Sequence, residues 1–127
     1  MAIELDHLIL TVKDRAKSVA FYQEVFHFTR DPDDGPFFVV RVGPRFVILL
    51  AQGPTEGGEH LAFSMTTPEF DAVFAHLKSA SIPFGDRYDR VGAMNDPGEE
   101  RGARGMGKSL YFFDPDRHLI EIRHYEP

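Results

Sequence analysis

The chain contains no cysteine, and this absence excludes disulfides, thiolate metal sites and a cysteine nucleophile. It also contains no apolar run near the roughly 20 residues that a membrane span requires. The longest run, residues 46–51, has the length of a strand. The N-terminus lacks the basic region of a signal peptide. We therefore expect a soluble cytoplasmic protein with no membrane association.

Positive charge is scarce as well. The 14 lysines and arginines are outnumbered by 20 aspartates and glutamates, which leaves a net charge of −6. Because binding to nucleic-acid phosphates needs a basic surface, we expect no nucleic-acid partner. The 43% of hydrophobic residues against 27% of charged ones is typical of a globular protein, and 127 residues are enough for one domain, residues 1–127.

Two segments of the chain follow the same β-α-β-β plan. Each begins with an apolar strand that leads into a helix. Asp14 is typical of the N-cap of the first helix, and Thr67 followed by Pro68 is typical of the start of the second. Each segment ends with two strands joined by a turn. The strands are predicted at residues 3–12, 37–42, 46–51, 59–65, 109–113 and 118–123.

Two other segments show no strand or helix pattern. Residues 31–36 contain the cluster of proline, aspartate and glycine that is typical of a turn. Residues 92–107 are rich in glycine and in charge. This composition predicts a mobile loop that can serve as a lid.

The internal repeat can be followed by its offsets. His7 aligns with His60 at an offset of 53 residues, and the closing hairpins align at an offset of 73, which matches Ile48 with Glu121. The difference of 20 residues predicts an insertion in the second copy. The pattern predicts an α+β fold with module one at residues 1–53 and module two at residues 58–125.

Two histidines and a glutamate are the candidate metal ligands. His7 and His60 occupy equivalent positions of the two copies, and Glu121 lies between two isoleucines of the last strand. Two imidazoles and one carboxylate bind a divalent ion and leave positions open for a substrate. A buried glutamate would otherwise carry a heavy desolvation cost, which a cation offsets.

A structural interpretation stands beside the metal site. In it, His7 and His60 are hydrogen-bonded core histidines related only by duplication, and Glu121 lies on an exposed face. The equivalent positions of the two histidines favour the metal interpretation. The other four histidines, among them His27 at the expected surface or C-cap position of the first helix, are expected to be structural.

The end of the chain carries a family resemblance. Residues 107–122 read Gly-Lys-Ser-Leu-Tyr-Phe-Phe-Asp-Pro-Asp-Arg-His-Leu-Ile-Glu-Ile. This segment resembles the closing phrase of the vicinal oxygen chelate superfamily, Tyr-Phe-x-Asp-Pro-Asp-Gly-His-x-Ile-Glu. The phrases around His7 and His60 are similar to the metal-bearing strands of that family, so the resemblance covers essentially the whole chain. The superfamily includes glyoxalase I, bleomycin resistance proteins, fosfomycin-modifying thiol transferases and extradiol dioxygenases.

The resemblance implies a fold, a cofactor and a partner. It implies two βαβββ modules that form a curved mixed sheet, as in the glyoxalase/dioxygenase-like fold. It implies His7, His60 and Glu121 as ligands of one divalent metal ion, which is Fe, Mn, Ni or Zn. It also implies a homodimer, in which one site can take ligands from both subunits.

The chain departs from the family pattern at several positions. Arg117 replaces the usual turn glycine, which predicts either a mildly strained left-handed residue or another type of turn. Ile48 stands where glyoxalase I carries a fourth ligand, a glutamate, and the additional histidines typical of ring-cleaving dioxygenases are missing. Ser109 and Tyr111 match the fosfomycin-modifying members, whereas Ile9 replaces their usual threonine.

Five further residues are candidates for substrate contacts. Tyr111 is the predicted catalytic residue, because its hydroxyl could hydrogen-bond a metal-bound oxygen; a core position is the alternative. Four residues are predicted to bind an anionic group of the substrate: Arg101, Arg104, Lys108 and Ser109. For the basic ones, the alternative is a solvated run of charges that also contains two glutamates, at positions 99 and 100.

These observations together predict a metal-dependent enzyme that acts on a small, oxygen-rich molecule. Dioxygenase chemistry or glyoxalase-like lyase chemistry is the preferred interpretation. One alternative is an antibiotic-modifying thiol transferase of the fosfomycin type. The other is a non-catalytic drug-binding protein of the bleomycin resistance type, in which the metal ligands are usually lost.

Overall fold

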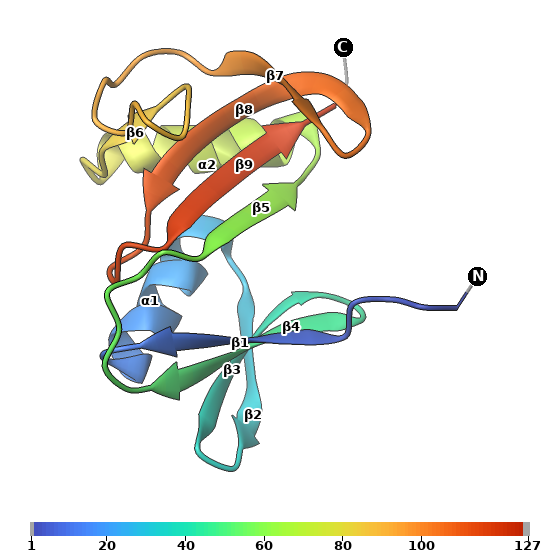
Figure 1. Cartoon of the computed structure of the whole chain (residues 1–127), viewed down its shortest axis with the longest axis vertical. Helices are drawn as coiled ribbons and strands as arrows, with labels where there is room; N and C mark the ends of the chain where they lie inside the picture. Colours follow the sequence, from blue (N-terminus) through green and yellow to red (C-terminus); the bar gives the residue numbers. More distant parts are fainter. Residues whose placement is uncertain (1, 126–127) are drawn as a thin grey trace. The chain divides into compact units, whose positions relative to one another are not determined.

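A computed structural model describes residues 2–125 of the chain. The chain divides into two compact units, Met1–Gly57 and Gly58–Pro127, and each unit has a mixed sheet and one helix of its own (Figure 1). The predicted α+β class is therefore confirmed. Neither helix within residues 2–125 is long and apolar enough to cross a membrane.

The first unit has the order β-α-β-β-β. Its four-stranded sheet runs β1-β4-β3-β2, with β1 parallel to β4 and the other pairs antiparallel. Asp14 caps the helix as predicted, because its side chain accepts a hydrogen bond from the backbone N–H of Lys17, and His27 is the C-cap in the left-handed conformation (φ 60°). The elements are β1 His7–Val12, α1 Arg15–Phe26, β2 Thr29–Asp34, β3 Phe37–Gly43 and β4 Phe46–Gln52.

The second unit repeats this plan with one additional strand. Its sheet runs β5-β9-β8-β6, with β7 paired to β8 as well, and β5 lies parallel to β9. Arg117 turns the chain between β8 and β9 with φ 69°, so of the two alternatives predicted there the left-handed residue is confirmed. The elements are β5 His60–Ser64, α2 Thr67–Ser79, β6 Phe84–Gly85, β7 Gly98–Gly102, β8 Gly105–Phe113 and β9 Leu119–His124.

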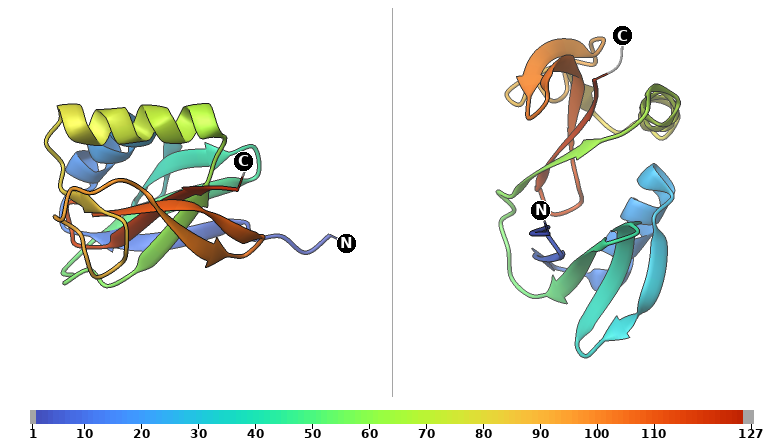
Figure 2. Two further views of the ribbon diagram at one scale, coloured as in Figure 1. Left: turned by 90° about the horizontal axis from the view of Figure 1, so that it is seen from above. Right: turned by 90° about the vertical axis from the view of Figure 1, so that its right-hand side faces the viewer.

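Helix α2 covers one face of the second sheet, and within residues 58–125 no helix covers the other face (Figure 2). Phe70 of α2 packs edge-on against the ring of His124, with 4.8 Å between centroids. Because alternate residues of a strand share a face, His124 shares the helix side with Ile120 and Ile122, which are fully buried. The other residues of β9, among them Glu121, lie on the open face.

The structure corrects several predicted boundaries. Strand β1 begins at His7 instead of residue 3, because its partner β4 begins only at Phe46. Residues 29–34 form the edge strand β2, although residues 31–36 were predicted as a turn. An edge strand tolerates Pro32, since it leaves one side of its backbone unpaired. The N-cap of α2 is Thr66, one residue earlier than predicted, and it forms a capping box with Glu69.

The loop predicted at residues 92–107 is wrong in its second half. Strand β7 pairs with β8 from Gly98 opposite Ser109 to Gly102 opposite Gly105, so this part of the segment is a hairpin. Some glycines of this hairpin are needed because neighbouring groups lie too close to leave room for a side chain. A Cβ at Gly107, for example, would overlap the carbonyl oxygen of His124.

The offset of 73 residues between the closing hairpins is also wrong. In the first unit Ile9 of β1 pairs with Leu49 of β4, and in the second Ala62 of β5 pairs with Glu121 of β9. The position equivalent to Glu121 is therefore Leu49, 72 residues earlier, and not Ile48. A one-residue shift moves a side chain to the other face of a sheet. The first unit still carries no carboxylate at this position.

Candidate metal centre

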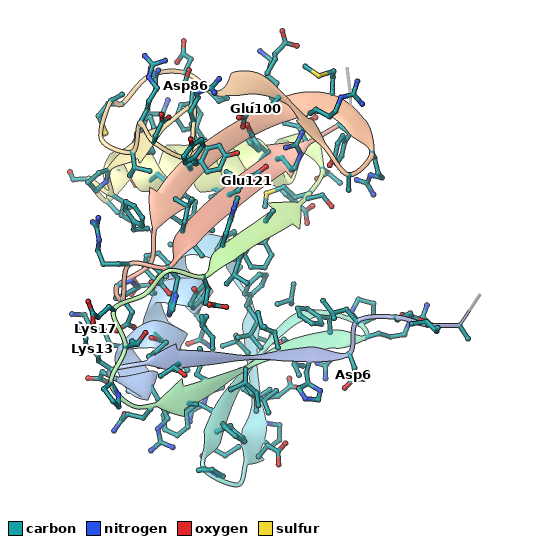
Figure 3. The ribbon with its side chains drawn as sticks, in the orientation of Figure 1. Asp6, Lys13, Lys17, Asp86, Glu100 and Glu121 are labelled. Atoms are coloured by element: carbon teal, nitrogen blue, oxygen red, sulfur yellow. The ribbon has the colours of Figure 1, made fainter. Side chains whose placement is uncertain are left out.

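The open face of the second sheet gathers polar side chains from four strands. Glu121 lies opposite Ala62 of β5 and Tyr111 of β8 in the sheet register, so all three side chains share this face. Glu100 of β7 lies on the same face, because it pairs with Gly107 of β8. Figure 3 labels Glu100 and Glu121, the carboxylates of the two strands that flank β8.

Two of the three predicted ligands meet on this face. The Nε2 atom of His60 lies 3.0 Å from Oε1 of Glu121. The His60 side chain is 49% exposed and that of Glu121 only 7% exposed, so a buried carboxylate meets a half-exposed imidazole. Nη1 of Arg123 donates to the other oxygen of Glu121 at 2.7 Å, which leaves Oε1 directed to His60. Because Arg123 is itself buried, this ion pair is shielded from water.

Glu100 holds two hydroxyl groups. The Tyr111 hydroxyl donates to Oε1 of Glu100 at 2.7 Å, and the Ser109 hydroxyl donates to the same oxygen at 2.6 Å. Burial raises the pKa of Tyr111 above its ordinary value, and the hydrogen bond to Glu100 and the charge of Glu121 raise it further. Tyr111 therefore stays a neutral phenol at physiological pH and cannot serve as a phenolate base.

These residues border a cavity of about 520 Å³. His60, Glu121 and Tyr111 line it on the sheet, and the β7–β8 turn contributes Arg101 and Arg104. The guanidinium of Arg104 lies 4.5 Å from the centre of the Tyr125 ring, which lines the cavity too. The cavity thus has a buried carboxylate and an imidazole at one side and cationic groups at another, all from the second unit.

The remaining predicted substrate contacts lie away from this cavity. Ser109 is fully buried under β7 and does not line the cavity. Lys108 alternates with Ser109 along β8 and is exposed on the helix side of the sheet, opposite His124 in the register. The structure therefore brings Arg101, Arg104 and Tyr111 to the cavity, but neither Ser109 nor Lys108.

His7 belongs to the first unit. It is the first residue of β1, and its Nδ1 atom lies 2.8 Å from the carboxylate of Asp6, which Figure 3 labels at this position. Because an ionised carboxylate can only accept, Nδ1 donates in this hydrogen bond. Ile9 and Thr11 share the face of His7, as Ala62 and Ser64 share that of His60.

The donor set fits a divalent cation. With metal–ligand bonds of about 2.1 Å, two ligands at a right angle are about 3 Å apart, which is close to the 3.0 Å between His60 and Glu121. A cation between them would take the place of the proton that His60 shares with Glu121. Within residues 2–125, no group of three or more histidine, aspartate or glutamate side chains gathers closely enough to hold an ion.

Arg123 and Glu100 are the two residues of this network that the sequence did not identify. Arg123 was not singled out as a site residue, and Glu100 was considered only as part of the alternative, a solvated run of charges. The alternation of Ser109, Tyr111 and Phe113 along β8 gives the face of that strand, but nothing in the sequence indicates that β7 pairs beside it. The position of Glu100 depends on that pairing.

Comparison with known proteins identifies the protein family to which the chain belongs. Residues 4–122 match the family model described as the glyoxalase/bleomycin resistance protein/dioxygenase superfamily. The chain belongs to this superfamily, which confirms the family that the sequence resembles.

Three relatives are informative. The chain is 31% identical over 130 residues to virulence protein STM3117 of Salmonella typhimurium, covering 95% of this chain and 83% of the relative. The crystal structure of STM3117 matches with a TM-score of 0.79 over 99% of both chains. Metallothiol transferase FosB of Shouchella clausii is 29% identical over 93% of this chain and 77% of its own. The oxidase ChaP-H2 has a TM-score of 0.84 at 23% identity, covering 99% of this chain and 96% of its own, and shares the fold.

Proposed function

We propose that the protein is a metal-dependent enzyme that acts on a small, oxygen-rich anion. His7, His60 and Glu121 would bind one divalent ion, and the family resemblance together with the equivalent repeat positions of the two histidines supports His7 as the third ligand. We propose that the protein works as a homodimer, so that His7 is supplied either by the same chain or by its partner.

One observation carries the proposal. A carboxylate that is 7% exposed lies 3.0 Å from a half-exposed imidazole nitrogen, at the edge of an open cavity. Oε2 of this carboxylate is paired with Arg123, whereas Oε1 is directed to the imidazole at the cavity, where a cation could take both groups as ligands. Arg123 fixes the orientation of this carboxylate, as partner groups commonly do for metal-binding carboxylates.

The cavity residues have separate roles in this account. Arg101 and Arg104 bind the anionic group of the substrate with charge-assisted hydrogen bonds. Tyr111 orients the reacting end by a hydrogen bond, since it lines the cavity beside Glu121. A bound divalent ion would act as a Lewis acid that stabilises negative charge on the substrate oxygens.

Thiol transfer is the second candidate reaction. It is supported by the 29% identity to FosB, which is named a metallothiol transferase, and by the fosfomycin-type pair Ser109 and Tyr111. Dioxygenase or lyase chemistry remains our preferred reaction class, because Ile9 departs from the threonine of the fosfomycin-modifying members. Binding of a drug without turnover is disfavoured by the retention of all three candidate ligands.

Metal analysis of protein purified without chelator tests the proposal. We expect close to one Fe, Mn, Ni or Zn ion per chain, and loss of most of that metal in His60→Ala and in Glu121→Gln. His76→Ala, on the second helix, is the matched control and should keep its metal. Metal-free wild-type protein, or equal metal content in all four proteins, would contradict the proposal.

Turnover assays then separate the reaction classes. Oxygen uptake with catechols by the metal-loaded protein would identify a dioxygenase, and consumption of a thiol with fosfomycin would identify a transferase. Either activity should disappear in His60→Ala, and addition of metal should not restore it. Light scattering reports the mass of the assembly, and a monomer would contradict the homodimer.

A further inference from the structure

Glu100 is the residue whose contacts the proposed function does not use. Its Oε1 atom accepts two hydrogen bonds, from the hydroxyls of Tyr111 and Ser109. Both bonds are short, and both donors are almost completely buried, with 5% of Tyr111 and none of Ser109 exposed. Such an arrangement fixes the rotation of both hydroxyl groups.

The backbone of β7 holds Glu100 in this place. Its carbonyl oxygen accepts a hydrogen bond of 2.8 Å from Nη2 of Arg123, the same guanidinium that binds Glu121. The residue directly opposite in the register is Gly107, which has no side chain. The Glu100 side chain can therefore lean along β8 to the diagonal neighbours Ser109 and Tyr111.

The direction of these bonds decides what Tyr111 can offer to a bound molecule. A phenol has one hydrogen to donate and accepts at its oxygen. Because the hydrogen is given to Glu100, the Tyr111 oxygen can only accept from a molecule in the cavity. Arg101 and Arg104, in contrast, can only donate. The cavity therefore presents donors at the β7–β8 turn and an acceptor on the sheet.

We propose that Glu100 is a specificity-determining residue that makes Tyr111 a hydrogen-bond acceptor, so that the cavity selects substrates carrying a hydroxyl group beside the anionic group. This inference rests on the proposed function for the use of the cavity and extends it to the substrate class. A molecule whose polar atoms are all acceptors, such as a simple phosphonate, would meet the Tyr111 oxygen without a hydrogen bond. Leaving that buried oxygen unsatisfied costs binding energy.

Two probes of equal charge test the inference. Propylphosphonic acid has only acceptors when ionised, and 1,2-dihydroxypropylphosphonic acid adds two hydroxyl donors. Calorimetry or a competition assay measures the dissociation constants of both probes for the protein, with its metal content measured in each sample. We expect the wild type to bind the dihydroxy probe at least about fivefold more tightly, as one buried hydrogen bond allows.

Two variants test whether Glu100 and Tyr111 cause the preference for the dihydroxy probe. Tyr111→Phe removes the acceptor. Glu100→Met removes the acceptor at 2.7 Å, so that the Tyr111 hydrogen can turn to the phosphonate, which then competes for it with Glu121. Each should reduce the ratio of the two dissociation constants by about fivefold. Glu99→Met is the matched control, because Glu99 is exposed on the other face of β7 and loses the same charge. Its ratio should equal that of the wild type.

The outcomes separate this inference from the metal proposal. An unchanged ratio in Tyr111→Phe or Glu100→Met, or no binding of either probe to the wild type, would overturn the role of Glu100. A ratio that depends on Tyr111 in protein without bound metal would support that role while contradicting the metal centre. If Glu100→Met does not fold, as judged by circular dichroism, Tyr111→Phe alone decides.

Discussion

At the scale of the residue, Arg123 organises the candidate metal centre. Its guanidinium binds the carboxylate of Glu121 through Nη1 and the carbonyl oxygen of Glu100 through Nη2. Its Nε has no hydrogen-bond partner although the atom is buried. A buried cation that keeps such an unsatisfied group is expensive, so its attraction to Glu121 has to offset the cost. Arg123 and Glu121 are therefore a coupled pair.

Arg123→Met should destabilise the protein strongly. The substitution leaves Glu121 buried without its cationic partner, and breaking a buried pair in this way costs about 3 kcal/mol. Urea unfolding of the metal-free protein measures the effect. Arg101→Met, which removes an exposed arginine from the same cavity, should change the free energy of unfolding by less than about 0.5 kcal/mol.

The double variant Arg123→Met, Glu121→Gln checks the cause. Because the uncompensated charge is gone, we expect it to be more stable than Arg123→Met alone. If the two variants are equally unstable, the loss of stability comes from the packing of the Arg123 side chain, and Arg123 and Glu121 are not energetically coupled.

At the scale of the element, the β7–β8 hairpin owes its position to glycine. Gly102 faces the site, and a Cβ there would overlap the Tyr125 hydroxyl and the Arg123 guanidinium. No side chain larger than hydrogen fits between β7 and these two groups. Gly102 and Gly107 thus serve close packing, and the hairpin that contains them forms a wall of the cavity.

Gly102→Ala should displace Arg123 and thereby disturb Glu121. We expect a loss of about 1–3 kcal/mol of stability, which is typical of overpacking, and weaker metal binding. Thermal unfolding and metal titration measure the two effects. Gly43→Ala is the control, since a Cβ at that strand position meets nothing within 4 Å, and it should be neutral in both measurements. Normal metal binding by Gly102→Ala would contradict the coupling between β7 and Glu121.

Much of the element pattern could be predicted, because it depends on local signals. Asp14 at an N-cap and the aromatic and β-branched residues of 37–42 identify their elements without any tertiary information. Strand β2 was missed because its residues have the composition of a turn, and only pairing with β3 makes it a strand. The register of β9 was missed by one residue. The two hairpin turns have the same length, since Arg41 pairs with Val47 and Phe113 pairs with Leu119, so the whole hairpin is displaced by one residue. The apolar residues of its strands do not distinguish the two offsets.

At the scale of the whole molecule, duplication explains why the candidate ligands could be found. His7 and His60 begin equivalent strands, β1 and β5, each parallel to the last strand of its unit. The repeat thus identified two residues that neither composition nor local pattern distinguishes. The same symmetry could not identify Glu100, because β7 has no counterpart in the first unit. The positions of residues in the insertion of the second unit, which contains β7, can be read only from the tertiary structure.

The number of imidazoles on one metal ion tests this account most directly. Electron spin echo measurements on protein loaded with Mn(II) or Cu(II) count coordinated histidine nitrogens. We expect two imidazoles in the wild type, one in His7→Ala, and two in the control His76→Ala. A single imidazole in the wild type, or two that persist in His7→Ala, would contradict a centre built from both copies of the repeat.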